Sequence, residues 1–357
     1  MSKKRKRPNH TTPGASNKAT GTHAGDRVWE LGVFLDKSIT PPAFLLRPWL
    51  RTGHVWLAYA PAGIGKTFFA LNVAYAVASG GRFLEWTAPG PRPVLYVDGE
   101  METWEMQARL RGIHEAAKRD GNGDPDAARL KLQGFAATYQ DPGSPFPDLA
   151  TEEGRRTLLR LARGKALVVI DNLTTTMRSG DENEAASWAP MQDTLVELRK
   201  TGTACLLIHH ANKTGDQRGT SAKDVILNGK IKLDRPKDAS PAGAAFVVTW
   251  EKARSLVGGD RVPIHAALTE DHAGVPAWEH VALDNGPHET LWRLVRSGEY
   301  ATQKALADAM SVSGPRITQL KKEAEERGIF TLKDFDFYLS EARSRQSEFS
   351  LEFAGGD

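Results

Sequence analysis

The sequence predicts an α/β fold with a mainly parallel sheet, followed by a C-terminal winged helix-turn-helix domain. Apolar runs of strand length alternate with helical stretches through most of the 357 residues, which is the order that parallel sheets require. One run, residues 166–171, is apolar up to a final carboxylate, as strands covered on both faces are. Beyond residue 286 the strands give way to three short helical stretches. The chain is therefore expected to hold a sheet domain and a smaller helical domain.

Charge and composition divide the chain into four expected parts. Residues 1–28 contain seven Lys and Arg side chains against one acid, a balance of +6, which leaves −3 for the rest of a chain whose net charge is +3. This tail has almost no large apolar residues and is predicted to be disordered. It is expected to serve solubility first, weak non-specific DNA contact second and a nuclear address last. Residues 29–285 form the predicted sheet domain, 286–345 the winged domain and 346–357 a flexible tail.

The composition places the chain among globular proteins. Hydrophobic residues make up 40% and charged residues 25% of the chain, which is ordinary for a soluble domain. No apolar run is long enough to span a bilayer, and the N-terminus lacks the apolar core of a signal peptide. The single cysteine, Cys205, excludes an intramolecular disulfide and a cysteine-based zinc site. We expect a cytoplasmic protein with no membrane partner, in which Cys205 is a small core residue.

Each predicted element follows from its periodicity and its flanking residues. A strand at 55–59 is followed by a glycine loop and an alanine-rich helix at 68–78. Further strands are predicted at 92–98, 130–132, 166–171, 204–208 and 246–250, and helices at 102–118, 151–163 and 184–200. An edge hairpin is predicted from residues 262–268 and 278–283. The C-terminal domain is predicted to contain helices at 288–296, 302–310 and 315–327 and a two-stranded wing at 328–338.

The loop after the first strand carries the pattern of a phosphate-binding P-loop. Its glycines let backbone N–H groups surround phosphates at a helix N-terminus, whose dipole favours anions. Lys66 is predicted to reach the β- and γ-phosphates, and the Thr67 hydroxyl to bind Mg²⁺. Ala60 stands where the pattern has its first glycine, and a methyl is tolerated there if the turn keeps φ negative. The sequence therefore predicts ATP and Mg²⁺ as ligands, in a cradle formed by Ala62, Gly63, Ile64, Gly65, Lys66, Thr67 and Phe68.

Carboxylates follow two of the predicted strands at the edge where open α/β sheets bind ligands. Asp171 ends its strand and is predicted to hold the Mg²⁺ shell. Hydrolysis also needs a base that polarises water. Asp98, Glu100 and Glu102 all lie where the second strand meets its loop, and we favour Glu100.

Two histidines and three cations are further candidates for contact with the γ-phosphate. His209 and His210 point to opposite faces of their strand, so one is predicted to act as a sensor while the other packs or caps the strand end. A structural role for both is the alternative. Arg218, Lys252 and Arg254 are candidates for a charge supplied to the nucleotide of a neighbouring subunit. For each of the three, a plain surface charge is the alternative.

The third predicted helix of the winged domain has the composition of a DNA-recognition helix. Its first part is basic and its last part acidic, and such helices read bases from their N-terminal part. Residues 286–340 carry eight basic and eight acidic side chains, so docking of a protein partner remains the alternative. The predicted DNA contacts are Arg316, Gln319, Lys321 and Lys322.

Taken together, the motifs resemble those of the bacterial RepA-type AAA ATPases. These are RecA-fold relatives of the hexameric replicative helicases found on plasmids and other mobile elements. The resemblance covers residues 29–283 and implies a ring of six subunits, with ATP between neighbours and single-stranded DNA in the central channel. It is carried by YAPAGIGKT at 59–67, VDGEM at 97–101, VIDNL at 169–173, GDEN at 180–183, IHHANK at 208–213 and QRGTS at 217–221.

The resemblance also implies a role for each matching residue. Lys66 and Thr67 become the phosphate and Mg²⁺ ligands, Glu100 the catalytic carboxylate and Asp171 the Walker B aspartate. One of the two histidines becomes the sensor. Arg218 matches an Arg-Gly-[Ser/Thr]-Ser finger, and Lys252-Ala253-Arg254 a Lys-x-Arg finger. The loops at 174–184 and 212–223 fall where channel loops lie, with Arg178 and Lys213 as DNA contacts. Residues 227–231, LNGKI, depart from the LDTVI of many relatives.

These observations predict an ATP-driven, ring-forming DNA helicase or translocase of a bacterial mobile replicon. A nucleotide-gated DNA-binding regulator without unwinding activity is the second hypothesis. A RecA-like filament former for strand exchange is the third. ATP hydrolysis that single-stranded DNA stimulates would favour the first hypothesis, and slow, unstimulated turnover with binding to a specific duplex site would favour the second.

Overall fold

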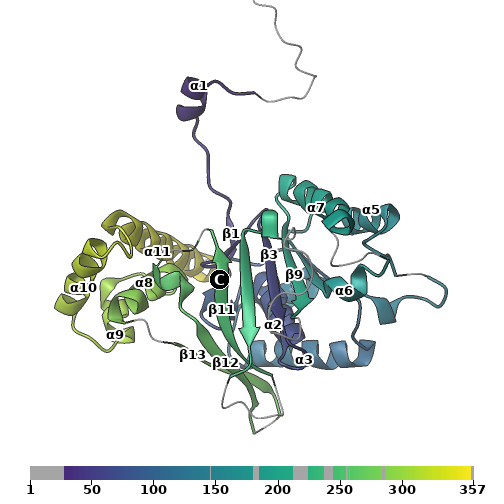
Figure 1. Ribbon diagram of the computed structural model, residues 1–357. Helices are drawn as coiled ribbons and strands as arrows, with labels where there is room; N and C mark the ends of the chain where they lie inside the picture. Colours follow the sequence, from purple (N-terminus) through teal and green to yellow (C-terminus); the bar gives the residue numbers. More distant parts are fainter. Residues whose placement is uncertain are drawn as a thin grey trace, which may run out of the picture. The chain divides into compact units, whose positions relative to one another are not determined.

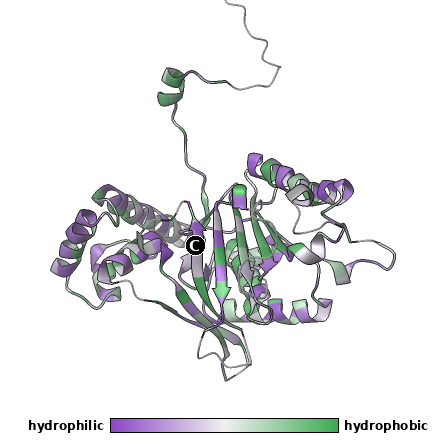
Figure 2. Cartoon of the chain, in the orientation of Figure 1, coloured by the Kyte–Doolittle hydropathy of each residue, from purple (hydrophilic) through white to green (hydrophobic). Residues whose placement is uncertain are grey.

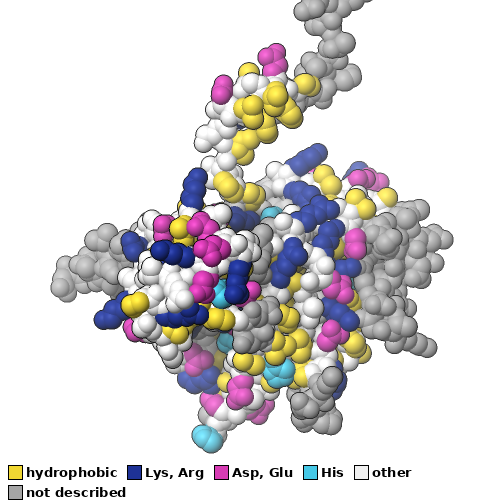
Figure 3. All heavy atoms as spheres, turned by 60° about the vertical axis from the view of Figure 1, so that its left-hand side comes forward, with side chains coloured by type: hydrophobic (Ala, Val, Ile, Leu, Met, Phe, Trp, Pro, Cys, Tyr) yellow, Lys and Arg dark blue, Asp and Glu magenta, His cyan; other side chains and the backbone are white. Residues whose placement is uncertain are grey.

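The computed structural model describes residues 28–144, 146–179, 185–211, 224–236, 244–254, 256, 258–272, 274–283 and 286–354. It divides into two compact units, Met1–Pro41 and Pro42–Asp357. In the first unit, the short helix α1 (Leu31–Leu35) buries none of its residues, and Trp29 stacks on Phe34 with ring centroids 4.5 Å apart. Hydrophobic side chains therefore gather on the surface of this segment (Figures 2 and 3).

The second unit is built on a nine-stranded sheet in the order β13-β12-β11-β10-β3-β9-β8-β6-β7 (Figure 1). Six neighbouring strands run parallel, which confirms the predicted α/β class. The antiparallel strands extend one edge, where the predicted hairpin lies. The parallel strands are β10 (Gly229–Asp234), β3 (Val55–Ala60), β9 (Ala204–His210), β8 (Leu167–Asp171), β6 (Val94–Asp98) and β7 (Leu132–Ala136). The antiparallel strands are β11 (Ala245–Ala253), β12 (Ile264–Glu270) and β13 (Pro276–Ala282).

Helices cover both faces of the parallel strands, and each face has its own apolar cluster. The cluster under α2 (Lys66–Ser79), α3 (Thr103–Arg119) and α4 (Pro125–Lys131) includes the tryptophans Trp49, Trp56 and Trp86. The other lies under α5 (Glu152–Leu161), α6 (Leu173–Thr176) and α7 (Ala185–Lys200). Buried strands between two layers must be apolar on both sides, as the green central strands of Figure 2 show. Short pieces complete the domain: β1 (Phe44–Leu46), β2 (Leu50–Arg51), β4 (Arg82–Phe83), β5 (Trp86–Thr87), η1 (Ala137–Tyr139) and η3 (Gly258–Arg261).

The structure bears on the predictions for Cys205 and for membrane-spanning helices. Cys205 is fully buried in β9, as expected, and burial raises the pKa of its thiol to about 12. That thiol is therefore an inert core group. Within the described residues, no helix combines the length and the apolar character that a bilayer crossing needs.

Strand β10 was not predicted, although its sequence carries a signal. Lys230, Ile231, Lys232 and Leu233 alternate, and the structure buries only the apolar members. The first residue of the strand, Gly229, has no room for a side chain, because a Cβ there would lie 2.0 Å from the ring of Trp56. The segment LNGKI at 227–231, which differs from the LDTVI of related sequences, therefore contains a glycine that packing against Trp56 requires.

Gly229→Ala is expected to lower the free energy of unfolding by about 1–3 kcal/mol, because overpacking a filled core forces its neighbours to shift. Urea unfolding followed by circular dichroism measures this. Gly134→Ala on β7 is the matched control, since a Cβ there meets nothing within 4 Å. Equal effects of the two substitutions would contradict the packing explanation.

One predicted element is shifted along the chain. The strand predicted at 130–132 begins only at Leu132, because α4 occupies the residues before it. Asp124 caps that helix by accepting a hydrogen bond from the Ala127 N–H, and Pro125 follows in the first turn. The Asp-Pro pair is a helix-start signal.

The C-terminal helices α8 (Pro287–Ser297), α9 (Gln303–Ala309) and α10 (Gly314–Glu326) confirm the three predicted ones, but the predicted wing is wrong. Helix α11 (Leu332–Ala354) runs through the second wing strand. Phe335, Leu339 and Ala342 repeat at helical spacing and are buried, whereas the aromatic residues of this stretch suggested a strand. Thr331 caps the helix by accepting a hydrogen bond from the Asp334 N–H at 3.1 Å.

Candidate nucleotide-binding site

The P-loop lies between β3 and α2, as the sequence predicts. Gly63 and Gly65 have φ values of 77° and 102°, which favour glycine. Gly65 is further constrained because a Cβ there would lie 2.5 Å from the Ala244 Cβ. Ala60 ends β3, fully buried and without a positive φ, so its methyl is accommodated. Ile64 packs its side chain in the core.

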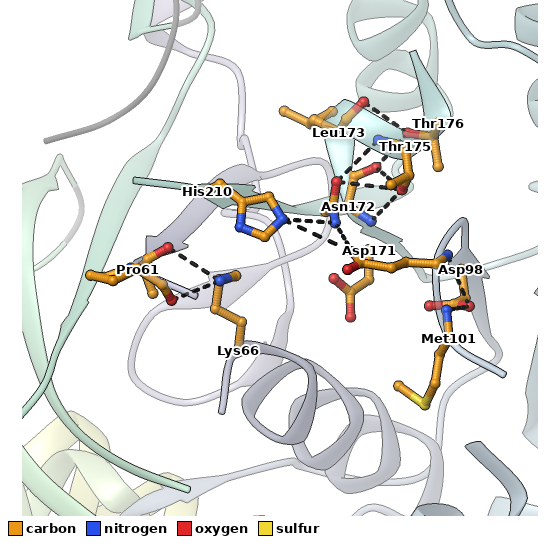
Figure 4. Close-up of polar contacts among 12 residues, drawn as sticks. Pro61, Lys66, Asp98, Met101, Asp171, Asn172, Leu173, Thr175, Thr176 and His210 are labelled. Carbon is orange, nitrogen blue, oxygen red and sulfur yellow. Dashed lines mark hydrogen bonds and ion pairs between the residues drawn. The ribbon is translucent and has the colours of Figure 1, made fainter. Parts of the chain in front are cut away.

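The loop borders a pocket of about 870 Å³, a size typical of ligand sites. Lys66 points into it and donates hydrogen bonds to the carbonyls of Ala60 (3.2 Å) and Pro61 (2.8 Å), as Figure 4 shows. Burial lowers the pKa of the Lys66 ammonium, while Asp171 and Glu100 oppose that shift. The pocket is also lined by Ala62, Gly63, Gly65, Thr67 and Phe68.

Asp171 lies across the pocket from the loop, at the end of β8. It is buried and accepts a hydrogen bond from the Tyr96 hydroxyl at 2.7 Å. Burial raises the pKa of its carboxyl, and the nearby hydroxyls of Tyr96 and Thr67 counteract the rise. Thr67 and Asp171 thus bring two oxygen ligands together, the donor type that Mg²⁺ prefers. With the glycine amides and Lys66, the site fits a nucleoside triphosphate and its Mg²⁺.

Glu100 is held at the mouth of the pocket by Asn172. The Asn172 amide nitrogen donates a hydrogen bond to Glu100 Oε2 at 2.5 Å and lies 3.1 Å from His210 Nε2. His210 Nε2 is 3.9 Å from the same carboxylate oxygen. Figure 4 shows the side chains of Asn172 and His210 directed toward each other. The Glu100 side chain is 60% exposed, so water reaches it. A carboxylate that is anchored, hydrated and close to the phosphate loop has the placement of a general base.

The other two carboxylates of this region have different environments. Asp98 is buried, accepts a hydrogen bond from the Met101 N–H at 2.9 Å, and has its pKa raised to about 7 by burial. Glu102 is exposed at the N-cap position of α3, without a side-chain capping bond. Glu100 is therefore the carboxylate of the three that combines exposure with a fixed side chain.

The raised pKa of Asp98 predicts a pH dependence. Its ordinary pKa is 3.8, so between about pH 4 and pH 7 the folded chain holds a proton that the unfolded chain has released. Stability from this group is present at low pH and lost as pH rises through 7. Asp98→Asn is expected to flatten that decline in urea unfolding measured from pH 4 to 8. Asp126→Asn, at an exposed position on α4, is the control, and an unchanged slope in the Asp98 variant would refute the assignment.

The two histidines separate as strand geometry predicts. His210 enters the pocket, while His209 is fully buried in the sheet. Tyr59 of β3 is the strand neighbour of His209, and Ala60 that of His210. The structure therefore places His210, not His209, where a γ-phosphate sensor would lie.

Two of the predicted trans-acting cations, Lys252 and Arg254, lie away from the pocket. Ala253, between Lys252 and Arg254, pairs with Gly229 of β10, which in turn pairs with Trp56 near the start of β3. The P-loop leaves the other end of β3, roughly 13 Å away along the strand direction. Arg218 and Lys213 lie outside the described residues.

The predicted DNA contacts are engaged within the chain to different extents. Arg178 donates to the Phe146 carbonyl at 2.5 Å. On α10, Arg316 pairs with Glu323 at 3.3 Å. Lys321 pairs with Asp336 at 3.4 Å and lies over the Phe335 ring, whereas Gln319 and Lys322 are exposed. On the face drawn in Figure 3, the Lys and Arg side chains of the described residues are interspersed with Asp and Glu.

Several pocket residues were not predicted. Asn172 follows Asp171 directly, and that position is the signal that could have found it. Arg109 lies 4.6 Å over the Phe68 ring and pairs with Glu105, and Arg235 donates to the Gly63 carbonyl at 3.3 Å. Both arginines reach the site through tertiary packing alone. Strand β12 contributes Leu268, Thr269 and Glu270 to the wall.

Comparisons with known proteins give distant similarities and one family. The KaiC-like protein PH0186 of Pyrococcus horikoshii OT3 superposes with a TM-score of 0.45 at 16% identity, over 66% of this chain and 93% of its own. The RadB recombinase superposes with a TM-score of 0.40 at 19% identity, over 61% and 88%.

A histidinol-phosphate aminotransferase of Pectobacterium atrosepticum is 32% identical over 120 residues, which are 32% of this chain. The chain thus spans about a third of the length of that relative (33%). A family model described as "AAA domain" matches residues 25–216, more than half of the sequence. The strand, P-loop and helix that build the pocket lie inside that match, and the chain belongs to the AAA domain family.

Proposed function

We propose that this protein is an ATP-driven DNA helicase or translocase of a bacterial mobile replicon, working as a ring, with six subunits as the expected number. The observation that carries the proposal is the division of the charged groups between two ends of one sheet. The phosphate loop, Asp171, Glu100 and His210 meet at one end, and Lys252 and Arg254 lie at the other. A subunit of this form supplies a hydrolytic site to one neighbour and cations to the next.

The pocket residues have distinct tasks in this proposal. Lys66 exchanges the loop carbonyls for the β- and γ-phosphates. Glu100, held by Asn172, accepts a proton from the attacking water, and His210 contacts the γ-phosphate and the Glu100–Asn172 pair. Mg²⁺, held by Thr67 and Asp171, would neutralise phosphate charge when bound.

In this proposal, Lys252 and Arg254 act on a neighbouring subunit because they lie far from the pocket of their own subunit. Within the pocket, Arg109 is committed to the Phe68 ring and to Glu105. Lys252 and Arg254 lie roughly 13 Å from their own P-loop along the strand direction, so their proposed target is the nucleotide of an adjacent subunit. A cation that arrives from a neighbour stabilises the charge that develops on the transferred phosphoryl group.

DNA is the proposed substrate on which this motor acts. The loops at 174–184 and 212–223 are proposed to face a central channel, with Arg178 and Lys213 on single-stranded DNA. Gln319 and Lys322 of α10 are proposed to contact duplex DNA, with Arg316 and Lys321 joining them if they leave their acidic partners.

A nucleotide-gated DNA-binding regulator is the second candidate. It is favoured by the ion pairs that tie the C-terminal helices to the ATPase domain, namely Arg47–Glu341 at 2.9 Å, Arg82–Glu299 at 2.8 Å and Arg293–Glu85 at 2.5 Å. In this candidate function, a nucleotide-dependent change in the ATPase domain would reach α8 and α11 through these contacts.

The deciding measurement is ATP hydrolysis by the full chain with and without single-stranded DNA, using Lys66→Ala as the blank. Strong stimulation that disappears in the variant supports the motor. Turnover that is indifferent to single-stranded DNA, together with retained binding to duplex DNA, supports the regulator. The absence of ATP hydrolysis under both conditions would refute both.

A further inference from the structure

A chain of polar side chains connects the P-loop strand with Lys252. Side chains on a strand alternate between faces, and Tyr59 shares the face of Val55 and Leu57, under α5, α6 and α7. The Tyr59 hydroxyl donates a hydrogen bond to Glu251 Oε1 on β11 at 2.5 Å. The network therefore begins at the residue that directly precedes the P-loop.

The chain continues across β10. Glu251 Oε2 pairs with Lys230 Nζ at 3.3 Å, and the same ammonium pairs with Asp224 Oδ2 at 3.1 Å. Lys230 is thus held between two carboxylates, with its ammonium 6.0 Å from the centre of the Tyr59 ring. A charge with two opposite partners in a half-buried place has little freedom to move.

The last step reaches Lys252. Its ammonium donates a hydrogen bond to the backbone carbonyl of Asp224, the residue whose carboxylate Lys230 holds. Partial burial, Arg254 and Lys230 lower the pKa of Lys252, and Asp224 raises it. The Lys252 ammonium is therefore fixed against Asp224, instead of extending freely from β11.

We propose that Tyr59, Glu251 and Lys230 are positioning residues that set the direction of Lys252 toward the nucleotide of a neighbouring subunit. The inference rests on the proposed function, in which Lys252 acts in trans. Because the Ala60 carbonyl next to Tyr59 accepts a hydrogen bond from Lys66, a change at the subunit's own P-loop moves the start of the network. The state of one site is thereby communicated to the cation that serves the next.

A neighbouring ion pair provides a matched control. Lys232 and Asp234 lie on the same strand and face as Lys230 and pair at 3.2 Å, with no contact to Glu251 or Asp224 among the interactions of the described residues. Lys232→Gln removes a charge from that surface and leaves the network intact.

The experiment measures steady-state ATP hydrolysis by the full-length oligomer. Tyr59→Phe and Glu251→Gln are expected to lower kcat about 10-fold with KM for ATP within twofold of the original, since misplacing a catalytic group by a fraction of an ångström has effects of this size. Lys230→Arg keeps the charge and is expected to retain most of the activity, and Lys232→Gln all of it. Tyr59→Phe removes a single hydroxyl, so the variant is expected to keep its fold. The midpoint of thermal unfolding measures this.

Mixed oligomers separate the inference from the proposed function. Lys66→Ala subunits lack a working site but keep an intact Lys252, so co-expression with Glu251→Gln or Lys252→Ala subunits is expected to restore activity above either variant alone. Recovery with Lys252→Ala but not with Glu251→Gln would overturn the positioning role alone. A normal kcat in both Tyr59→Phe and Glu251→Gln would also overturn the positioning role alone. Failure to recover with Lys252→Ala would overturn the action of Lys252 in trans and the positioning inference with it, whereas the proposed motor is refuted separately, by the absence of ATP hydrolysis with and without single-stranded DNA.

Discussion

Glu100→Gln is expected to lower the rate of ATP hydrolysis about 10³-fold while ATP binding changes less than about twofold. The loss corresponds to removal of a general base, for which factors of about 10² to 10⁴ are typical. Binding is retained because the amide is isosteric and the phosphate contacts come from the P-loop and Lys66. Single-turnover hydrolysis and binding of a fluorescent ATP analogue measure the two quantities separately.

Glu102→Gln is the matched control for this prediction. Glu102 lines the same pocket two residues along the chain, but Asn172 holds Glu100. The control is expected to hydrolyse ATP within about threefold of the original rate. If Glu102→Gln were the slow variant and Glu100→Gln the normal one, the base would be misassigned. If both were normal, the water would have to be activated by another group of the pocket.

The sequence was sufficient for the part of the site that is local in the chain. Gly63, Gly65, Lys66 and Thr67 lie within one loop and one helix turn, so their spacing alone predicted the form of the phosphate loop. Asp171 was equally predictable, because a carboxylate that ends a buried parallel strand must lie at the ligand-binding edge.

Residues that depend on packing between distant segments could not be predicted in the same way. Arg109 lines the pocket from α3, and Arg235, just after β10, contacts the Gly63 carbonyl. No spacing in the chain encodes either approach. Strand β10 itself was missed because its lysines interrupt the apolar run that marked the other parallel strands. The predicted wing was wrong for the opposite reason. The aromatic residues at 335–338 resemble a strand when taken alone, and only the buried Leu339 and Ala342 that follow show the helical spacing.

The second large effect is expected at the junction between the ATPase domain and the C-terminal helices. Arg296 of α8 pairs with Asp260 of η3, and both side chains are almost completely buried. Burial lowers the pKa of Arg296 to about 10, and its guanidinium lies over the rings of Trp292 and Tyr338. Asp260→Ala is expected to lower the free energy of unfolding by about 3–5 kcal/mol, because it leaves a buried cation without its partner.

Two variants show whether the unpaired charge causes that loss. Glu299→Gln breaks the more exposed Arg82–Glu299 pair of the same junction and is expected to cost at most about 1 kcal/mol. The double variant Asp260→Ala with Arg296→Met removes both charges and is expected to recover most of the stability, since apolar replacements of buried pairs are often neutral. Urea unfolding followed by tryptophan fluorescence compares the three. If the double variant were as unstable as Asp260→Ala, the loss would come from a cavity at the junction and not from the buried guanidinium.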